Sequence, residues 1–356
     1  MTPQQYMHRC LELAEKAKGH TAPNPMVGAV LVHSERIIGE GWHHYYGADH
    51  AEVNCIENVA ADDKHLIPES AMYVNLEPCA HYGITPPCAT RLVHERVKKV
   101  VIANTDPFEM VQGKGIEILQ AAGIVVETGM LQQEGAWLNR RFFCFHKQKR
   151  PYIILKWAQT ADGYIGPADK SRLQITGIET NTMVHKWRTE EGAIMVGTTT
   201  AINDNPQLTA RLHTGKQPLR IALDRNLQIP HTHHLLDTAA ATWIVNDQRE
   251  TLDGNIHYIQ LPFDETLLPS LLRRLHHTGI QSLIVEGGTV LLSSFMQMGL
   301  WDEARVLKGN MSIGNGVQAP TLADAAPAFT AAIGTDTLEV FINKKSEYPY
   351  VGGMEL

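Results

Sequence analysis

The stretches DHAEV (residues 49–53) and NLEPCAHYGITPPC (residues 75–88) decide how the first part of this 356-residue chain is interpreted. They bring one histidine, two cysteines and a carboxylate into short range: His50, Cys79, Cys88 and Glu52. A catalytic zinc site has three such protein ligands and leaves the fourth position for water, whose pKa falls from about 15.7 to about 7. We therefore predict a zinc site at His50, Cys79 and Cys88, with Glu52 carrying protons in a hydrolytic deamination.

Local sequence places these groups at helix starts. Cys88 follows two prolines and begins a predicted helix over CATRLVHERV (88–97), where free amides favour a thiolate. His50 and Glu52 fall in the first turn of another predicted helix, so both can face one pocket. The alternative is a structural zinc site with Cys55 as its fourth ligand. Cys55 lies off the helix face of His50, and such a site would leave Glu52 without a role.

Composition and charge exclude several other classes of protein. The length predicts two domains, and 44% hydrophobic with 19% charged residues is typical of a globular protein. A net charge of −7 argues against nucleic-acid binding through a basic face. Neither a membrane-spanning apolar run nor a secretory signal is visible. Five cysteines are an odd number, which fits a reducing compartment, so we expect a cytoplasmic protein. From the charge and the lack of an apolar run, we expect it to bind neither nucleic acid nor membranes.

The first half alternates helix and strand patterns. Helices are expected over about Pro3–Gly19, from Ala51, and over Gly115–Ala122. Short apolar strands are expected at VGAVLVH (27–33), IIGEGW (37–42), AMYVNL (71–76), KKVVIANT (98–105) and IVVETG (124–129). This order predicts an α/β fold with helices on both faces of a sheet.

A basic segment, HKQKRP (146–151), marks the predicted boundary between domains 1–147 and 148–356. The second half again alternates. Its expected strands are 152–158, 193–197, 219–224, 241–246, 282–288, 303–309 and 337–343, and its expected helices are Thr180–Glu190, Leu267–His277 and one ending at Met298. We expect the last residues, SEYPYVGGMEL (346–356), to form a loose tail.

In the second half, SLIVEGGTVLLSSF (282–295) reads as a strand that ends in Glu286-Gly287-Gly288, followed by a helix. Two glycines allow a close backbone approach, and the amides of a helix start suit a pyrophosphate. A Gly-Gly pair alone more often marks a tight turn. It gains weight from KWAQTADGYIG (156–166), HKWR (185–188) and VGTTTAINDNPQLTARL (196–212). No G-x-G-x-x-G follows a strand, so a Rossmann site is not indicated.

The first-half motifs resemble the family of bifunctional riboflavin-biosynthesis proteins, in which a diaminohydroxyphosphoribosylaminopyrimidine deaminase is fused to a 5-amino-6-(5-phosphoribosylamino)uracil reductase. The resemblance rests on PNPMVGAVLV (23–32), GEGWH (39–43), the two opening stretches with their long spacing between cysteines, NTDPF (104–108) and QGKG (112–115). It implies a cytidine-deaminase-like three-layer domain that binds zinc through His50, Cys79 and Cys88, with Glu52 as the catalytic residue. Asn24 and His43 are the implied substrate contacts.

The four second-half stretches resemble the reductase part of the same family. The implied fold is dihydrofolate-reductase-like, and the implied cofactor is NADPH. The implied NADPH contacts are Ala158, Thr200, Asp204, Gly288, Thr289, Val290, Leu291, Leu292, Ser293 and Ser294. The implied contacts to a phosphoribosyl pyrimidine substrate are Arg188, Leu208, Arg211 and Glu286, with Lys156 as a further candidate for the sugar.

The chain departs from the family pattern in two places. Ile84 stands where a basic residue usually precedes TPPC. Either another cation, Arg91 or Lys114, pairs with the substrate phosphate, or phosphate binding is weakened. Arg172-Leu173-Gln174 stands where a serine and a tryptophan usually occur, so neither Arg172 nor Gln174 is assigned to the site. Trp157, Trp187 and Trp243 are expected in the core.

The resulting prediction is a bifunctional enzyme, which we expect to be a homo-oligomer, that deaminates the pyrimidine and then reduces its ribosyl group with NADPH. One alternative is an active deaminase with an impaired or altered reductase domain. A second is a tRNA or nucleoside deaminase with an unrelated second half. A third is a non-catalytic module stabilised by zinc.

Overall fold

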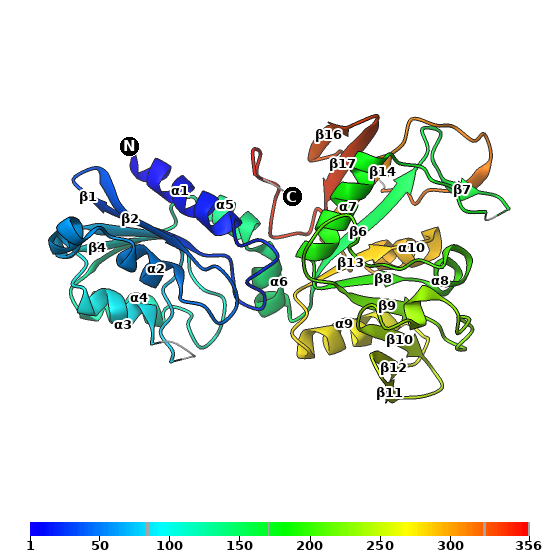
Figure 1. Cartoon of the computed structure of the whole chain (residues 1–356), viewed down its shortest axis with the longest axis horizontal. Helices are drawn as coiled ribbons and strands as arrows, with labels where there is room; N and C mark the ends of the chain where they lie inside the picture. Colours follow the sequence, from blue (N-terminus) through cyan, green and yellow to red (C-terminus); the bar gives the residue numbers. More distant parts are fainter. Residues whose placement is uncertain (83–85, 170, 323–324, 355–356) are drawn as a thin grey trace. The chain divides into compact units, whose positions relative to one another are not determined.

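The computed structural model describes residues 1–82, 86–169, 171–322 and 325–354, and the chain divides into two compact units. The first unit comprises Met1–Gln148 together with the C-terminal residues from Val351, and the second comprises Lys149–Tyr350. Each unit has its own sheet and its own hydrophobic core (Figure 1). The two units are therefore described separately.

The first unit is built on a five-stranded sheet in the order β2-β1-β3-β4-β5. Strand β1 is antiparallel to β2 and β3, whereas β3, β4 and β5 are parallel. The turn between β1 and β2 is formed by Ser34 and Glu35, with φ values of 46° and 66°, as a two-residue hairpin turn requires. The strands are β1 (Gly28–His33), β2 (Arg36–Trp42), β3 (Ala71–Leu76), β4 (Lys99–Asn104) and β5 (Val125–Thr128).

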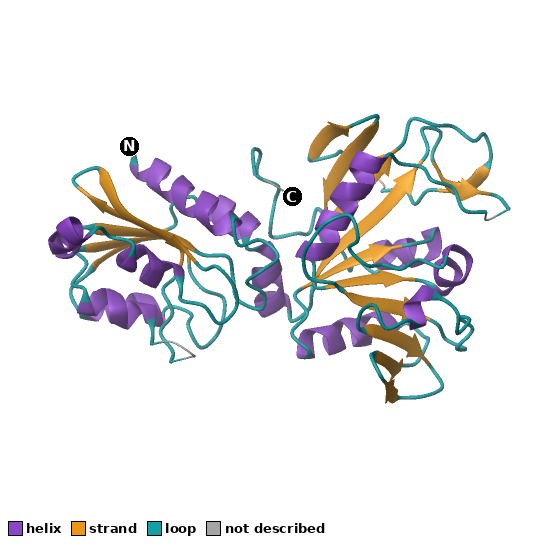
Figure 2. Ribbon diagram, in the orientation of Figure 1, coloured by secondary structure: helices purple, strands orange, loops and turns teal. Residues whose placement is uncertain are grey.

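Helices cover both faces of this sheet, which confirms the predicted three-layer arrangement (Figure 2). Alternate residues of a strand point to opposite faces. Ala29 and Leu31 of β1 pack in the core formed with α2 (Ala51–Glu57), α3 (Cys88–His94) and α4 (Lys114–Ala121), and Val30 and Val32 pack against α1 (Pro3–Glu15). Because both faces are covered, the central strands β1, β3 and β4 are almost continuously apolar.

The second unit contains a ten-stranded sheet in the order β11-β12-β10-β9-β8-β13-β6-β14-β17-β16. The seven strands from β12 to β14 in this order are parallel. At the edges, β11 is antiparallel to β12, β17 to β14, and β16 to β17. The strands are β6 (Tyr152–Gln159), β8 (Ala193–Val196), β9 (Leu219–Leu223), β10 (Thr242–Asn246), β11 (Thr251–Asp253), β12 (Ile256–Gln260), β13 (Ser282–Glu286), β14 (Glu303–Lys308), β16 (Phe329–Ile333) and β17 (Asp336–Ile342). A separate pair joins β7 (Tyr164–Pro167) to β15 (Gly316–Gln318).

The main core of this unit lies between one face of the sheet and helices α9 (Leu267–His277) and α10 (Thr289–Gln297). Trp157 and Trp243 are buried in it, and Trp187 is buried on α7 (Ile178–Glu190), which confirms the prediction for all three tryptophans. Every strand and helix expected in the second half is present. The α/β class predicted for both halves is therefore confirmed.

Several short elements were not predicted, because segments this short show little periodicity. They are the 3₁₀ helices Ala61–Glu69 and His234–Leu236, the helices α5 (Gln132–Leu138), α6 (Arg140–Gln148) and α8 (Thr198–Asp204), and strands β7, β11, β12, β15 and β16. The basic segment read as a boundary is helical as far as Gln148. The expectation of a loose tail was wrong, since Tyr348 is 2% exposed and Met354 packs against the cluster around Leu11. Within the described residues, no helix is long and apolar enough to cross a membrane.

Gly28 allows α1 to lie directly on β1, and its replacement provides a test of this packing. A Cβ atom at residue 28 would lie 2.1 Å from the backbone oxygen of Cys10 and 2.8 Å from the amide nitrogen of Ala14. We expect Gly28→Ala to destabilise the first unit by about 1–3 kcal/mol and to lower its thermal unfolding temperature. The control is Gly352→Ala, where a Cβ meets nothing within 4 Å. Equal unfolding temperatures for the two variants would contradict the packing.

Candidate functional sites

Three potential metal ligands meet where two helices and one loop of the first unit converge. His50 is the N-cap residue of α2, Cys79 lies in the loop after β3, and Cys88 begins α3. The Nδ1 atom of His50 is 3.2 Å from Sγ of Cys88 and 3.4 Å from Sγ of Cys79, and the three ligand atoms lie within 4.8 Å of one another. Two sulfurs and one imidazole nitrogen form a donor set that suits zinc.

The charge state of Cys79 also suits a metal ligand. The side chain of Cys88, followed by that of His50, hydrogen-bonds to Cys79 and lowers the pKa of its thiol to about 4, despite the opposing effect of burial. The backbone N–H of Cys88 donates to Sγ of Cys79 at 3.3 Å. A thiolate is the form in which cysteine binds metals. The local fold therefore prepares Cys79 for coordination.

Glu52 lies beside the three-ligand cluster and is not part of it. It is 3% exposed in the first turn of α2, and burial raises the pKa of its carboxyl. Cys55, the candidate fourth ligand, is buried in the hydrophobic core and lies outside the metal cluster found among the described residues. The arrangement is that of three ligands with a separate acid, which a structural four-ligand site would not need.

His43 and Asn24 form a hydrogen-bonded pair near this cluster. The His43 ring centroid is 5.3 Å from that of His50. Nδ1 of His43 is 3.1 Å from the carbonyl oxygen of Asp49, so this nitrogen must carry the proton. Burial lowers the pKa of His43, and in the neutral ring Nε2 accepts from the Asn24 amide at 3.1 Å. The pair thus has one defined hydrogen-bonding direction.

Glu77 is a supporting residue that the sequence did not reveal. Its carboxylate is 3% exposed and lies two residues before Cys79. One oxygen accepts from the backbone N–H groups of Asp106 (3.2 Å) and Gly113 (3.0 Å), and the other from those of Gly115 (3.0 Å) and Ile116 (3.3 Å). Glu77 therefore ties the end of β3 to the loop before α4. The signal was present as a carboxylate inside the motif NLEPC, but its partners are far along the chain.

The two candidate cations for the substrate phosphate differ in their surroundings. Arg91 is paired with Glu57 at 2.7 Å and with Glu95 at 2.8 Å. Among the described residues, Lys114 forms no ion pair and donates to the backbone oxygens of Glu109 and Met110, each at 3.2 Å. Of the two cations, Lys114 is therefore the one whose charge no described carboxylate neutralises. Ile84, where the family pattern has a basic residue, lies outside the described residues.

In the second unit, three of the candidate substrate contacts form a cluster of charged side chains, namely Lys156, Arg188 and Glu286. Lys156 and Glu286 are register partners on these strands, with Nζ of Lys156 3.8 Å from Glu286. Arg188 of α7 donates to both oxygens of Glu286 at 3.2 Å. Burial acts to raise the pKa of Glu286, but the charges of Arg188 and Lys156 outweigh it and lower that pKa. Glu286 is therefore a largely buried anion, with its side chain 13% exposed, held between two cations.

The loop after α8 brings Leu208 and Arg211 to the same region. Arg188 donates to the backbone oxygen of Thr209 at 3.2 Å, and Arg211 donates to the Thr209 hydroxyl at 3.0 Å. Nδ1 of His185 accepts from the backbone N–H of Arg211 at 2.7 Å. Burial, helped by Arg188, lowers the pKa of His185 to about 4, so its ring is a neutral acceptor at physiological pH. His185 was not predicted as a site residue.

The predicted cofactor contacts lie on α8, on α10 and the glycine that precedes it, and on β6. Gly287 has φ of 129°, Gly288 is the N-cap of α10, and the N–H of Gly288 donates to the Thr200 hydroxyl at 3.1 Å. Glycines allow a ligand to approach the backbone closely, and the free amides at a helix start suit a pyrophosphate. The side chains of Leu291 and Leu292 are buried in the core, so only their backbone can face a cofactor, whereas Val290 is 82% exposed. The remaining predicted residues are Thr289, Ser293 and Ser294 on α10, Ala158 on β6 and Asp204, the last residue of α8.

The segment Arg172-Leu173-Gln174, which departs from the family pattern, lies close to the predicted cofactor contact Asp204. Arg172 is exposed, and its charge opposes the rise that burial causes in the pKa of Asp204. Gln174 donates to the backbone oxygen of Thr176 at 3.0 Å. The segment is therefore beside the site, although neither side chain was assigned to it.

Comparison with known protein families divides the chain in the same way. Residues 1–104 match the cytidine and deoxycytidylate deaminase zinc-binding region, and residues 151–333 match the RibD C-terminal domain. The two matches define a bifunctional enzyme with a zinc-dependent deaminase and an NADPH-dependent reductase.

Individual relatives extend this likeness over nearly the whole chain. Riboflavin biosynthesis protein RibD of Aquifex aeolicus is 40% identical over 319 residues, which cover 88% of each chain, and that of Bacillus amyloliquefaciens is 40% identical over 326 residues, covering 89% of this chain and 86% of the relative. The structure of Acinetobacter baumannii RibD (form 1) matches with a TM-score of 0.87 at 34% identity, covering 96% of this chain and 99% of that one. The chain belongs to the RibD family of riboflavin-biosynthesis proteins.

A solved Thermotoga maritima protein, described as a diaminohydroxyphosphoribosylaminopyrimidine deaminase/5-amino-6-(5-phosphoribosylamino)uracil reductase, matches with a TM-score of 0.85 at 31% identity, covering 96% of this chain and 98% of that one. The predicted fold class, bifunctional activity and cofactors are confirmed. The alternatives of an unrelated second half and of a non-catalytic module are wrong. The reductase match runs through Arg172 and Gln174, and nothing in it indicates an impaired reductase.

Replacement of Glu77 tests its support of the zinc ligands. Glu77→Gln retains the shape of the side chain but replaces one acceptor oxygen with an NH₂ group that faces backbone N–H donors. We expect zinc binding to weaken by about 10- to 100-fold, as is typical for residues that orient metal ligands. Zinc retention against a chelator measures this effect, with Glu117→Gln on the exposed side of α4 as the control. Equal retention in both variants would contradict the role.

The low pKa of His185 predicts a pH-dependent stability of the second unit. The folded value of about 4 lies below the unfolded value of about 6.5, so protonation favours the unfolded chain. The contribution is complete above pH of about 6.5 and is lost as the pH falls toward 4. We expect the unfolding midpoint of this unit to fall over that range, and His185→Gln to flatten the dependence. An imidazole NMR titration of His185 near pH 6.5 would contradict its burial in neutral form.

Proposed function

We propose that the enzyme deaminates 2,5-diamino-6-(5-phosphoribosylamino)pyrimidin-4(3H)-one in domain 1–147 and then reduces the ribosyl group of the product in domain 148–356. The final product would be 5-amino-6-(5-phosphoribitylamino)uracil. The activity named for the Thermotoga maritima relative supports these substrates. The observation that carries the proposal is the three-ligand cluster with Glu52 beside it.

In the first reaction, His50, Cys79 and Cys88 would hold zinc, which supplies a water molecule acidified for attack when it is bound. Glu52 would accept a proton from the attacking water and deliver it to the departing amine. Burial favours this role, because it raises the pKa of Glu52 toward the range where a carboxyl both accepts and releases a proton. Ammonia is the second product.

Asn24 and His43 would orient the pyrimidine. His43 is locked by Asp49 with its proton on Nδ1, so that Nε2 accepts from the Asn24 amide and directs the Asn24 oxygen away from the ring. That oxygen can then accept a hydrogen bond from a pyrimidine N–H or amino group. An amide fixed in this way recognises a base edge by direction as well as by distance.

In the second reaction, the chemistry that bound NADPH would supply is a hydride for C1 of the ribosyl group. The backbone at Gly288–Ser294, with Thr200, Asp204 and Ala158, would bind the cofactor. Lys156 is buried next to Glu286, and burial lowers the pKa of its ammonium. Lys156 can therefore donate a proton to the sugar ring oxygen as the ring opens.

Arg188, Leu208, Arg211 and Glu286 would bind the ribosylamino substrate. Arg188 is already engaged by Glu286 and by the backbone of Thr209. Arg211 is therefore the better candidate to clamp the substrate phosphate, which a guanidinium can bind with two hydrogen bonds.

The predicted cytoplasmic location and homo-oligomeric state stay predictions. Light scattering on the purified chain checks the oligomeric state.

Replacement of Glu52 separates the two activities. Glu52→Gln removes the proton carrier while leaving the three ligands in place, so deamination should fall by about 10²- to 10⁴-fold. Zinc content and NADPH-dependent reduction of pre-deaminated substrate should stay unchanged. Glu57→Gln, on the exposed side of the same helix, is the matched control. Normal ammonia release by Glu52→Gln would refute the assigned role.

A further inference from the structure

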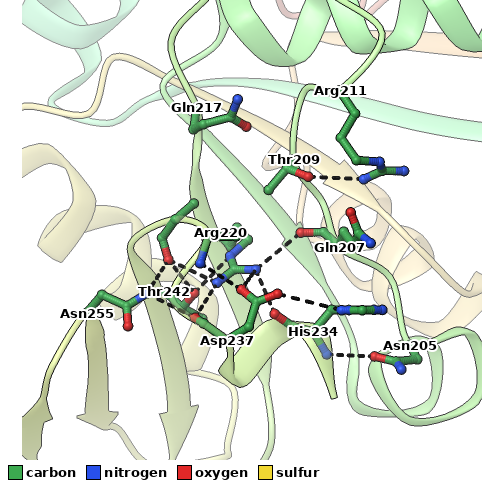
Figure 3. Close-up of polar contacts among 12 residues, drawn as sticks. Asn205, Gln207, Thr209, Arg211, Gln217, Arg220, His234, Asp237, Thr242 and Asn255 are labelled. Atoms are coloured by element: carbon green, nitrogen blue, oxygen red, sulfur yellow. Dashed lines mark hydrogen bonds and ion pairs between the residues drawn. The ribbon is translucent and has the colours of Figure 1, made fainter. Parts of the chain in front are cut away.

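Arg220 is a charged side chain within strand β9, whose other four residues are apolar. Its relative exposure is 0%. Burying a guanidinium is costly unless its N–H groups are hydrogen-bonded. Arg220 meets this condition with partners from several segments of the second unit, as Figure 3 shows.

The partners of Arg220 are mainly backbone oxygens. Its Nε donates to the Thr242 hydroxyl at 2.9 Å, and the other two nitrogens contact Gln207 O (3.4 Å), His234 O (2.7 Å), Asp237 Oδ1 (3.0 Å), Asp237 O (3.1 Å) and Ala240 O (2.9 Å). Only one of these six acceptors is a carboxylate. The guanidinium therefore holds the backbone of segment 234–240 in place through hydrogen bonds to its carbonyl oxygens.

Segment 234–240 in turn holds the loop that leads to the proposed substrate contacts. The backbone N–H of His234 donates to Asn205 Oδ1 at 2.8 Å (Figure 3). His233 Nε2 lies 2.9 Å from the backbone oxygen of Ile202 in α8. Arg220 thus reaches the start of this loop through His234 and touches it directly at Gln207.

The loop needs such support because it lacks regular structure. Residues 205–218 belong to no helix or strand. Asn205 and Leu208 have φ values of 42° and 54°, a region that costs non-glycine residues free energy. Gln217 clasps the backbone of Ala210 with bonds of 2.8 and 3.1 Å. Side-chain bonds of this kind, rather than strand pairing, determine where Leu208 and Arg211 lie.

We infer that Arg220 is a positioning residue of the reductase site, which fixes through His234 and Gln207 the loop that carries Leu208 and Arg211. The inference rests on the substrate contacts proposed above. Arg220 does not touch the substrate; it determines where residues that do so are held. Displacement of a binding group by about 1 Å can reduce catalytic efficiency by about 10²-fold.

The test is steady-state reduction of the ribosylamino substrate by the full-length chain at saturating NADPH. Arg220→Lys retains the charge but has three donors for six acceptors. We expect KM for the ribosylamino substrate to rise by about tenfold or more in folded protein, while deamination by the same preparation stays unchanged. A purely structural role would lower the amount of active enzyme without changing KM.

A second variant keeps the test decisive if Arg220→Lys fails to fold. Asn205→Gly removes the acceptor for the His234 N–H while tolerating φ of 42°, so it should raise the same KM. The matched control is Asn255→Ala, which removes bonds of 3.0 and 2.6 Å to Asp237 O and Ala240 O but leaves the contacts of Arg220 with His234 and Gln207 in place. Its KM should stay within about twofold of the parent value.

Arg211→Ala distinguishes the inference from the function on which it rests. A raised KM in Arg211→Ala together with parent KM values in the folded Arg220→Lys and Asn205→Gly variants would overturn the inference alone. An unchanged KM in Arg211→Ala would show that Arg211 does not bind the substrate. It would overturn both the proposed substrate contact and the inference about Arg220. Raised KM values in Arg211→Ala, Arg220→Lys and Asn205→Gly, with Asn255→Ala unchanged, would support it.

Discussion

The meeting of one imidazole nitrogen and two sulfurs within 4.8 Å is the constraint on which the first unit depends. Two helix starts and one strand end must converge to bring His50, Cys79 and Cys88 together. The alternating apolar faces of β1, β3 and β4 provide that convergence by holding helices on both sides of the sheet. Glu77 adds a polar tie next to Cys79, so the ligand loop is anchored by hydrogen bonds as well as by packing.

In the second unit, the candidate site is held together by ion pairs between charged side chains. Glu286 is largely buried, yet it is stabilised as an anion by Lys156 on the neighbouring strand and Arg188 on α7. Removal of one partner from a buried pair leaves an uncompensated charge, which is strongly destabilising. The same groups are those proposed to bind and protonate the substrate. Stability and function therefore depend on one cluster of charges.

Local sequence patterns were enough to predict most strands, the helices on both faces of the first sheet and the clustering of His50, Cys79 and Cys88. These features follow from short-range alternation and from residue types that bind metal. The assignment of these three residues as zinc ligands stays a prediction. Glu77 and Arg220 were missed for a common reason. The partners of Glu77 lie 29 to 39 residues away, and those of Arg220 lie 13 to 22 residues away along an irregular path. A buried charge inside an apolar strand signals that partners exist, but only the fold identifies them. The short helix α8 lacked any such local signal.

Zinc-edge X-ray absorption on the purified full-length chain tests the central claim most directly. One zinc per chain, bound by two sulfurs, one imidazole nitrogen and one non-protein oxygen, is the predicted result. A site with four protein ligands, or a sulfur count other than two, would contradict an open catalytic zinc at His50, Cys79 and Cys88.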